Sequence, residues 1–116
     1  MIAFTCVVQE GCVPEDLRPD LAAGLARVST SILGGSPNNV TVEFKEIPRG
    51  YGFRGGEPST TSMVRGSVPD GCDQEVRVRL LQELSDMWRK ITGCTVDELV
   101  MSARDQNYKI QPLYKA

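Results

Sequence analysis

The side chains considered first as candidates for chemistry are thiols and guanidinium groups; the 116 residues include no histidine. The missing imidazole excludes every Ser–His, Cys–His or histidine-base mechanism. The four cysteines show no Cys-X-X-Cys spacing; they are Cys6, Cys12, Cys72 and Cys94. Four scattered thiolates without a histidine are a poor zinc set, so we expect no metal site, and nothing in the sequence indicates a cofactor. We interpret the cysteines as reduced thiols of a cytoplasmic protein.

Two of the cysteines are candidate reactive thiols. Cys12 and Cys72 follow two predicted strands at nearly equivalent places, and each precedes a predicted helix. The positive end of a helix dipole favours the thiolate. The alternative is that both are small buried residues, which is the commoner role of a free cysteine.

Two arginines are candidate carboxylate ligands. Arg54 lies in a glycine-rich segment, IPRGYGFRGGEPSTT at 47–61, and Arg65 lies on the predicted strand that follows. A guanidinium fork presents two donors that match the two oxygens of a carboxylate. The glycines allow backbone amides to approach an anion, although such residues more often serve turns that need a positive φ. The alternative is that both arginines are solvated surface charges.

Composition and charge describe an ordinary globular chain of one domain. A net charge of −2 gives no electrostatic reason to expect nucleic acid or an anionic membrane as a partner. The sequence has no run of 18 apolar residues and no basic segment followed by an apolar one at its start. We therefore expect no membrane span and no secretion signal.

A strand–helix–strand unit that occurs twice positions these candidates. Residues 2–46 return 59 positions later without a gap. The apolar positions of the two predicted helices are Leu17, Leu21, Leu25, Val28 and Ile32 in the first, and Val76, Leu80, Leu84, Met87 and Ile91 in the second. Both sets advance in steps of four, four, three and four, which is one face of an α-helix.

The duplication divides a single domain, 1–116, into unit one at about 1–48, a joint at 49–61, unit two at about 62–105 and a tail at 106–116. The predicted strands cover 2–9, 40–45, 63–68 and 99–103, and the second helix covers 73–92. Pro14 and Pro19 give two possible starts for the first helix. The resulting order of elements, β-α-β-β-α-β, fits two folds. One is the ferredoxin-like fold, and the other has two parallel β-α-β units side by side with both helices on one face. The long joint at 49–61 argues against the ferredoxin-like fold, in which a tight β-hairpin joins the two units.

Three stretches resemble the tautomerase superfamily: the first strand ending in QEG, FKEIPRGYGFRGGEP at 44–58, and MVRGSVPDGCDQE at 63–75. The closer resemblance is to the cis-3-chloroacrylic acid dehalogenase-like proteins, which carry both units in one chain, whereas 4-oxalocrotonate tautomerases carry one. It covers roughly positions 1–105. It implies an α+β fold with a four-stranded sheet and two helices on one face, assembled as a homotrimer. It also implies a pocket where an N-terminal proline acts on small oxo acids and arginines hold the substrate carboxylate.

This chain departs from the family pattern at the reactive positions. The proline position is Met1, and the histidine position of the dehalogenase-like group is Ser29. The two arginines after the third strand fall on Pro69 and Cys72. Because Ile2 is bulky, we expect Met1 to be retained. Its α-amine is then the candidate base or Schiff-base amine.

Two functions follow from this reading. The first is a tautomerase-superfamily enzyme without the proline, acting on a small oxo or unsaturated carboxylic acid. Met1 would be its catalytic residue, and its substrate-binding residues would be Ser29, Arg54, Arg65 and Cys72. The alternative is a catalytically inactive relative that binds a small ligand or has a structural role. The missing proline, histidine and arginine pair favour the alternative, while the resemblance narrowly favours the enzyme.

Overall fold

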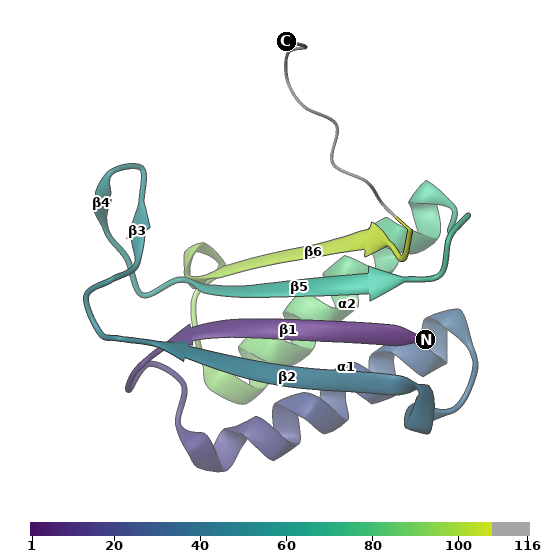
Figure 1. Cartoon of the computed structure of the whole chain (residues 1–116), viewed down its shortest axis with the longest axis horizontal. Helices are drawn as coiled ribbons and strands as arrows, with labels where there is room; N and C mark the ends of the chain where they lie inside the picture. The colour runs from purple at the N-terminus through teal and green to yellow at the C-terminus, as the bar shows by residue number, and fades with distance from the viewer. Residues whose placement is uncertain (108–116) are drawn as a thin grey trace, which may run out of the picture.

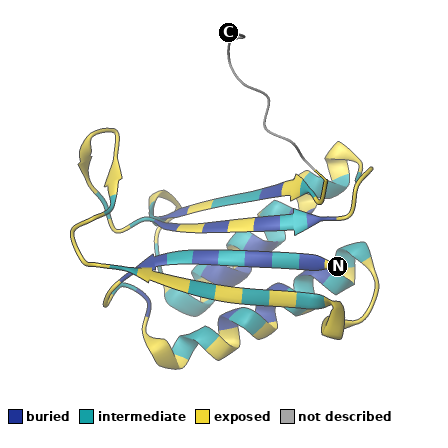
Figure 2. Cartoon of the chain, in the orientation of Figure 1, coloured by how far each residue is buried: buried dark blue, intermediate teal, exposed yellow. Residues whose placement is uncertain are grey.

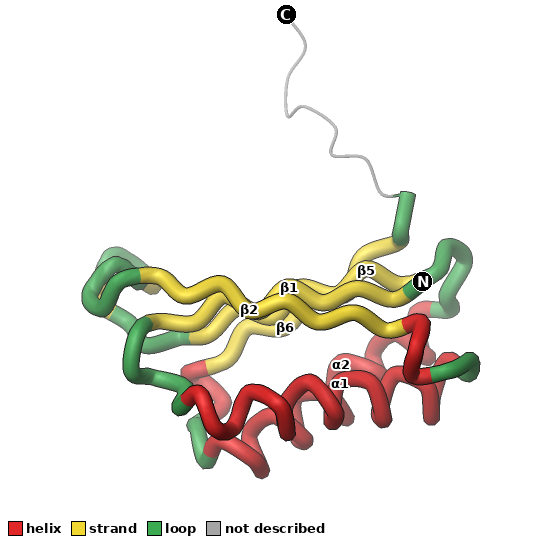
Figure 3. The backbone as a smooth tube through the Cα atoms, turned by 60° about the horizontal axis from the view of Figure 1, so that its bottom comes forward, coloured by secondary structure: helices red, strands yellow, loops and turns green. Residues whose placement is uncertain are grey.

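The computed structural model describes residues 1–107 as two layers, a sheet with two helices on one face (Figures 1 and 3). The sheet contains β1 (Ile2–Gln9), β2 (Val40–Ile47), β5 (Ser62–Val68) and β6 (Leu99–Asp105). The helices are α1 (Arg18–Leu33) and α2 (Gln74–Thr92). Shorter elements are the 3₁₀ turns η1 (Glu15–Leu17), η2 (Pro37–Asn39) and η3 (Val96–Glu98), and the strands β3 (Phe53–Arg54) and β4 (Glu57–Pro58). Within residues 1–107, no helix is both long and apolar enough to cross a membrane.

The sheet order, β2-β1-β5-β6, decides between the two predicted folds. β1 runs parallel to β2, and β5 runs parallel to β6. The two units meet through the antiparallel pair β1 and β5. The two strands of each unit are therefore direct neighbours, which excludes the split β-α-β of the ferredoxin-like fold. The predicted arrangement of two side-by-side units is confirmed.

The 59-residue repeat appears in space as two equivalent halves. α1 corresponds to α2, β2 to β6 and η2 to η3, each displaced by that interval. Because β1 and β5 are antiparallel, an approximate two-fold axis relates the units, so each end of the sheet has a counterpart at the other end. We call them the Met1 end, with Met1 and the start of β2, and the hairpin end, with β3, β4 and the start of β6 (Figure 1).

The core lies between the sheet and the helices (Figure 2). Alternate residues of β1 are buried because successive strand side chains point to opposite faces. The apolar helix face predicted from the sequence supplies the other side, with Leu21, Leu25, Leu80 and Leu84 fully buried. Burial raises the pKa of the Cys6 thiol to about 12, so this cysteine is an unreactive core residue.

Within the core, equivalent positions of the two halves carry side chains of different size. Trp88 on α2 stacks on Phe44 of β2, with ring centroids 6.2 Å apart. Their counterparts one repeat away are Ser29 and Ala103, both small and buried. The symmetric frame therefore holds an asymmetric core.

The structure refines the predicted boundaries at both ends of unit one. α1 begins at Arg18, so the second of the two possible starts is correct, and Pro19 lies in the first turn, where its missing N–H is not needed. β2 continues to Ile47. In the second unit, β6 extends two residues beyond the predicted end, to Asp105. Most of the predicted tail, 108–116, lies outside the described residues.

The joint contains a small hairpin that the sequence analysis did not predict. β3 pairs with β4 in an antiparallel register, Phe53 with Pro58 and Arg54 with Glu57. Gly55 and Gly56 form its tip with φ of 60° and 80°, a conformation that favours glycine and suits a two-residue hairpin loop. Strands of two residues are too short for an alternating pattern to show, so the sequence predicts only a connection in this segment.

Candidate functional site

At the Met1 end, the sheet face that no helix covers presents an exposed terminus and two arginines. Met1 is 66% exposed. Since Ile2 and Phe4 are buried against the helices, Ala3 and Thr5 lie on the uncovered face. A shallow pocket of about 310 Å³ opens there. Its lining residues are Ala3, Thr5, Arg65, Gly66, Ser67, Arg104 and Asp105.

Positive charge dominates this Met1-end pocket. Arg65 is exposed, and its side chain has no hydrogen bond or ion pair among the described residues. Arg104 lies two positions along on the neighbouring strand, opposite Ser67, whereas Arg65 lies opposite Ser102. The one carboxylate in the lining, Asp105, is paired with Arg77 at 2.5 Å. The pocket therefore suits a small anion such as a carboxylate.

The predicted site residues at the Met1 end do not all meet. Cys72 lies in the turn between β5 and α2, at this end, but not in the lining of the 310 Å³ pocket. Ser29 is fully buried on α1, and its hydroxyl has no hydrogen-bond partner in the described part of the chain. In this chain Ser29 is therefore separated from solvent by the core. Arg104 was missed because the predicted strand stopped one residue before it.

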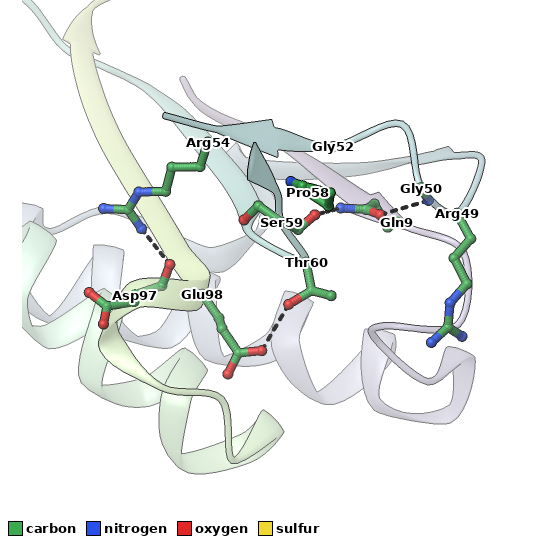
Figure 4. A pocket seen from close by; sticks show the side chains of 10 residues that line it. All are labelled: Gln9, Arg49, Gly50, Gly52, Arg54, Pro58, Ser59, Thr60, Asp97 and Glu98. Carbon is green, nitrogen blue, oxygen red and sulfur yellow. Dashed lines mark hydrogen bonds between the residues drawn. The ribbon is translucent and has the colours of Figure 1, made fainter. Parts of the chain in front are cut away.

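Arg54 lies at the hairpin end, separated from Met1 by the whole length of β1, which is roughly 25 Å for a strand of eight residues. It lines a cavity of about 710 Å³, which we call the hairpin-end cavity (Figure 4). The remaining lining residues are Gln9, Arg49, Gly50, Gly52, Pro58, Ser59, Thr60, Asp97 and Glu98. Within one chain, Arg54 and Met1 cannot therefore contact the same small ligand.

Buried Gln9 organises the hairpin-end cavity. Its side chain is at the end of β1 and only 2% exposed. Its amide oxygen accepts a hydrogen bond from the Gly50 N–H at 3.2 Å, and its amide nitrogen donates to the Ser59 carbonyl. A Cβ at Gly52 would lie 2.8 Å from that same carbonyl, so a side chain there requires the backbone to move. The wall of the cavity is thus fixed by specific contacts.

The hairpin-end cavity carries both signs of charge. Arg54 donates to the Asp97 backbone carbonyl. The Glu98 carboxylate accepts from the Thr95 N–H at 3.0 Å and from the Thr60 hydroxyl at 3.0 Å. These contacts, the Thr95 N–H first, lower the pKa of Glu98. Arg49, in contrast, has no hydrogen bond or ion pair among residues 1–107.

A smaller cavity of about 200 Å³ adjoins the hairpin-end cavity and shares Arg49, Thr60 and Glu98 with it. Cys12 and Cys94 line it, both half-buried. All four cysteines are free thiols. Over residues 1–107, no group of three or more histidine, cysteine or acidic side chains is placed to hold a metal ion.

Comparison with known proteins identifies the fold. No protein-family model matches the chain, and no curated protein matches it. The crystal structure of native Ps01740 is 27% identical, with a TM-score of 0.84 over 89% of this chain and 92% of that chain. N1, a member of the cis-3-chloroacrylic acid dehalogenase (cis-CaaD) family, is 13% identical, with a TM-score of 0.84 over 89% and 73%. A fused 4-OT wild-type symmetric trimer is 15% identical, with a TM-score of 0.80 over 89% and 84%.

These matches cover both β-α-β units, since each spans about nine-tenths of this chain. The arrangement that they share is the one derived above from strand order and register. The chain has the fold of the tautomerase superfamily, as its resemblance to the cis-3-chloroacrylic acid dehalogenase-like and 4-oxalocrotonate tautomerase-like proteins implied.

Proposed function

We propose that this chain is a tautomerase-superfamily protein that binds a small oxo or unsaturated carboxylic acid at the Met1 end and acts on it without the usual proline. The observation that carries the proposal is Arg65, an exposed guanidinium without a partner among the described residues, beside the first strand. Arg104 adds a second guanidinium to the same pocket. The fold supports the superfamily assignment.

The proposed chemistry uses an amine and a guanidinium. Arg65 donates two hydrogen bonds to the substrate carboxylate and so fixes its orientation. The α-amine of Met1 then removes a proton from the carbon next to the oxo group and returns it at another position, with no net change in atoms. Alternatively, the amine attacks the oxo carbon and releases water, giving a Schiff base that hydrolysis reverses.

The second candidate is a catalytically inactive protein that uses the Met1-end pocket only to bind a ligand, or that has a structural role. It is favoured by the residues at the family's reactive positions, Met1, Ser29, Pro69 and Cys72. None of these side chains is a strong base. The enzyme and the ligand-binding relative both predict carboxylate binding, so turnover separates these two, whereas a purely structural role predicts no binding.

We further propose that the chain assembles as a homotrimer. The uncovered sheet face carries exposed apolar side chains, Met63 at 39% and Val100 at 43%, and the joint adds Tyr51 and Phe53 at 72% and 65%. A pocket of about 350 Å³ connects these four residues. Cyclic association buries such an apolar patch, which lies at the hairpin end of this face and not at the Met1-end pocket, in a closed assembly. One of the matched structures is a symmetric trimer, which supports the proposal.

The test is an assay of the purified protein with a panel of enol and 2-oxo acids, following ketonisation by absorbance. Borohydride trapping with mass measurement of the N-terminal peptide runs in parallel. Arg65→Ala should lower kcat/KM or weaken binding by at least about tenfold, since a charged hydrogen bond is lost. The matched control is Arg79→Ala, because Arg79 pairs with Glu83 on the exposed surface of α2.

Each outcome has a defined meaning. Turnover that depends on Arg65 supports the enzyme. Binding without turnover or adduct across the panel supports the inactive relative. If Arg65→Ala and Arg79→Ala behave alike, the Met1-end pocket is not the site. An activity that survives blocking of the amine and is lost in Cys12→Ser or Cys72→Ser moves the chemistry to a thiol.

A further inference from the structure

We propose that the hairpin-end cavity is a second, separate site that binds a small zwitterion, with the ligand's anionic group at Arg49 and its cationic group at Glu98. The proposal does not depend on the function proposed for the Met1 end. It rests on the construction of the cavity, on the placement of its charges and on the difference between the two ends of the sheet.

The hairpin-end cavity has a wall fixed by buried polar contacts. Gln9 is 2% exposed and uses both ends of its amide to hold the joint, at Gly50 and at Ser59. Gly52 packs against the same amide and leaves no room for a side chain. A wall held in this way is preorganised, so a ligand does not have to order the loop when it binds.

Four charged residues line the cavity, Arg49, Arg54, Asp97 and Glu98, and of these Arg49 and Glu98 are opposite in charge and unpaired with each other. Arg49 and Glu98 both line the 710 Å³ cavity and the adjoining 200 Å³ cavity. No salt bridge joins them, and in Figure 4 their charged groups lie on either side of Thr60. A ligand with one charge would satisfy one side and face a like charge on the other. A zwitterion satisfies both.

Glu98 is held ionised for this role. Three hydrogen bonds reach its carboxylate, from the Thr95 N–H, the Thr95 hydroxyl and the Thr60 hydroxyl. These donors also fix its orientation. Arg49 has no such partner within residues 1–107, so its five donors are available to a carboxylate.

The two ends of the sheet differ at equivalent positions. One repeat before Asp97 and Glu98 of η3 stand Asn38 and Asn39 of η2. The Met1 end therefore has amides where the hairpin end has carboxylates. This predicts different ligands for the two ends: an acid at the Met1-end pocket, and a molecule with both an acid and an ammonium group at the hairpin-end cavity.

The test is a titration of the ¹⁵N-labelled protein, followed by amide chemical shifts. The probes are glycine, 4-aminobutyrate and 6-aminohexanoate, with butyrate and butylamine as singly charged controls. We expect at least one amino acid to shift the amides of Gly50, Gly52, Thr60 and Glu98 in a saturable way. Its Kd should be at least tenfold below those of butyrate and butylamine.

Matched variants assign the binding to the two charges. Arg49→Gln and Glu98→Gln should each raise that Kd at least tenfold. Arg27→Gln and Asp20→Asn are the controls, because these residues line a groove between the helices and carry the same charges. Arg65→Ala should also leave the Kd unchanged, which keeps this result independent of the Met1-end proposal. Spectral dispersion shows directly whether each variant is folded.

Three results would overturn the proposal: no saturable shift with any of the three amino acids, butyrate or butylamine binding as tightly as the best amino acid, or unchanged affinity in Arg49→Gln. The last result is decisive for Arg49, because its guanidinium has no hydrogen bond or ion pair among the described residues that its removal would disrupt.

Discussion

The two β-α-β units have the same topology and an equivalent ion pair, but they differ in the core and at the ends of the sheet. Arg18 pairs with Glu46 at 2.5 Å in unit one, and Arg77 pairs with Asp105 at 2.5 Å in unit two, at positions one repeat apart. The apolar helix faces also match. The same kinds of contact, an ion pair and an apolar helix face, therefore stabilise both units. The residues that differ between the units determine what each end of the sheet can bind.

The largest expected effect comes from the core asymmetry. Trp88→Ala removes a fully buried indole that stacks on Phe44, and it should reduce the free energy of unfolding by about 3–5 kcal/mol. Urea denaturation of the variant and the wild type measures it. A loss below about 1 kcal/mol would contradict this packing, because it would mean that the buried indole contributes little to the core.

The helices and most strands could be predicted from the sequence, because the residue patterns that specify them repeat in the two units. The helix faces, the strands at 2–9 and 63–68 and the glycine after each helix all follow from spacing and residue type. Strand order was harder to obtain, because the β-α-β-β-α-β order fits two folds. Pairing between β1 and β5 is a long-range contact that local patterns do not encode.

The site residues were harder to predict from the sequence, because membership of a site depends on which end of the sheet a residue lies at. Arg54 and Arg65 are 11 positions apart and were both assigned to the Met1 end, yet the joint carries Arg54 to the hairpin end. Ser29 has a polar side chain, but the helix phase turns it into the core. The hairpin-end cavity brings together residues from β1, the joint and η3, and no local motif links these segments.

The next largest effects concern the two ion pairs. Arg77→Ala should lower the free energy of unfolding by about 1–2 kcal/mol, and Arg18→Ala by less. Arg77 also donates to the Ala103 carbonyl at 3.1 Å, whereas Arg18 adds only a contact with the Phe44 ring, 5.6 Å from its centroid. Double-mutant cycles with Asp105→Ala and Glu46→Ala isolate each pair. Equal losses for both arginines would show that the extra hydrogen bond contributes nothing.

A smaller effect of opposite sign is expected at Ser29. Its buried hydroxyl has no partner among the described residues, so Ser29→Ala should leave stability unchanged or raise it by up to about 1 kcal/mol. The predicted role of Ser29 in substrate binding is tested with the same variant. Weaker carboxylate binding with unchanged stability would support that role, while unchanged binding would leave Ser29 as a core residue.

The smallest effect concerns Glu98 and its counterpart Asn39, and it is a change in pH dependence. The folded state lowers the pKa of Glu98, so its contribution to stability is present above the ordinary glutamate pKa of about 4.3. That contribution disappears as the pH falls through the lower pKa of the folded state. The melting temperature of Glu98→Gln should therefore lie below that of the wild type at pH 7, and the difference should shrink as the pH falls below the ordinary glutamate pKa.

Asn39→Glu provides the converse experiment at the Met1 end. Ser36 precedes η2 as Thr95 precedes η3, and the Asn39 N–H bonds the Ser36 carbonyl as the Glu98 N–H bonds the Thr95 carbonyl. A glutamate at 39 would recreate the reciprocal contact of a capping box, Ser-Pro-Asn-Glu. It should therefore raise the melting temperature at pH 7 but not at pH 3. If Asn39→Glu is neutral at both pH values, the two ends differ in backbone geometry, and the difference is not confined to the side chains at 39 and 98.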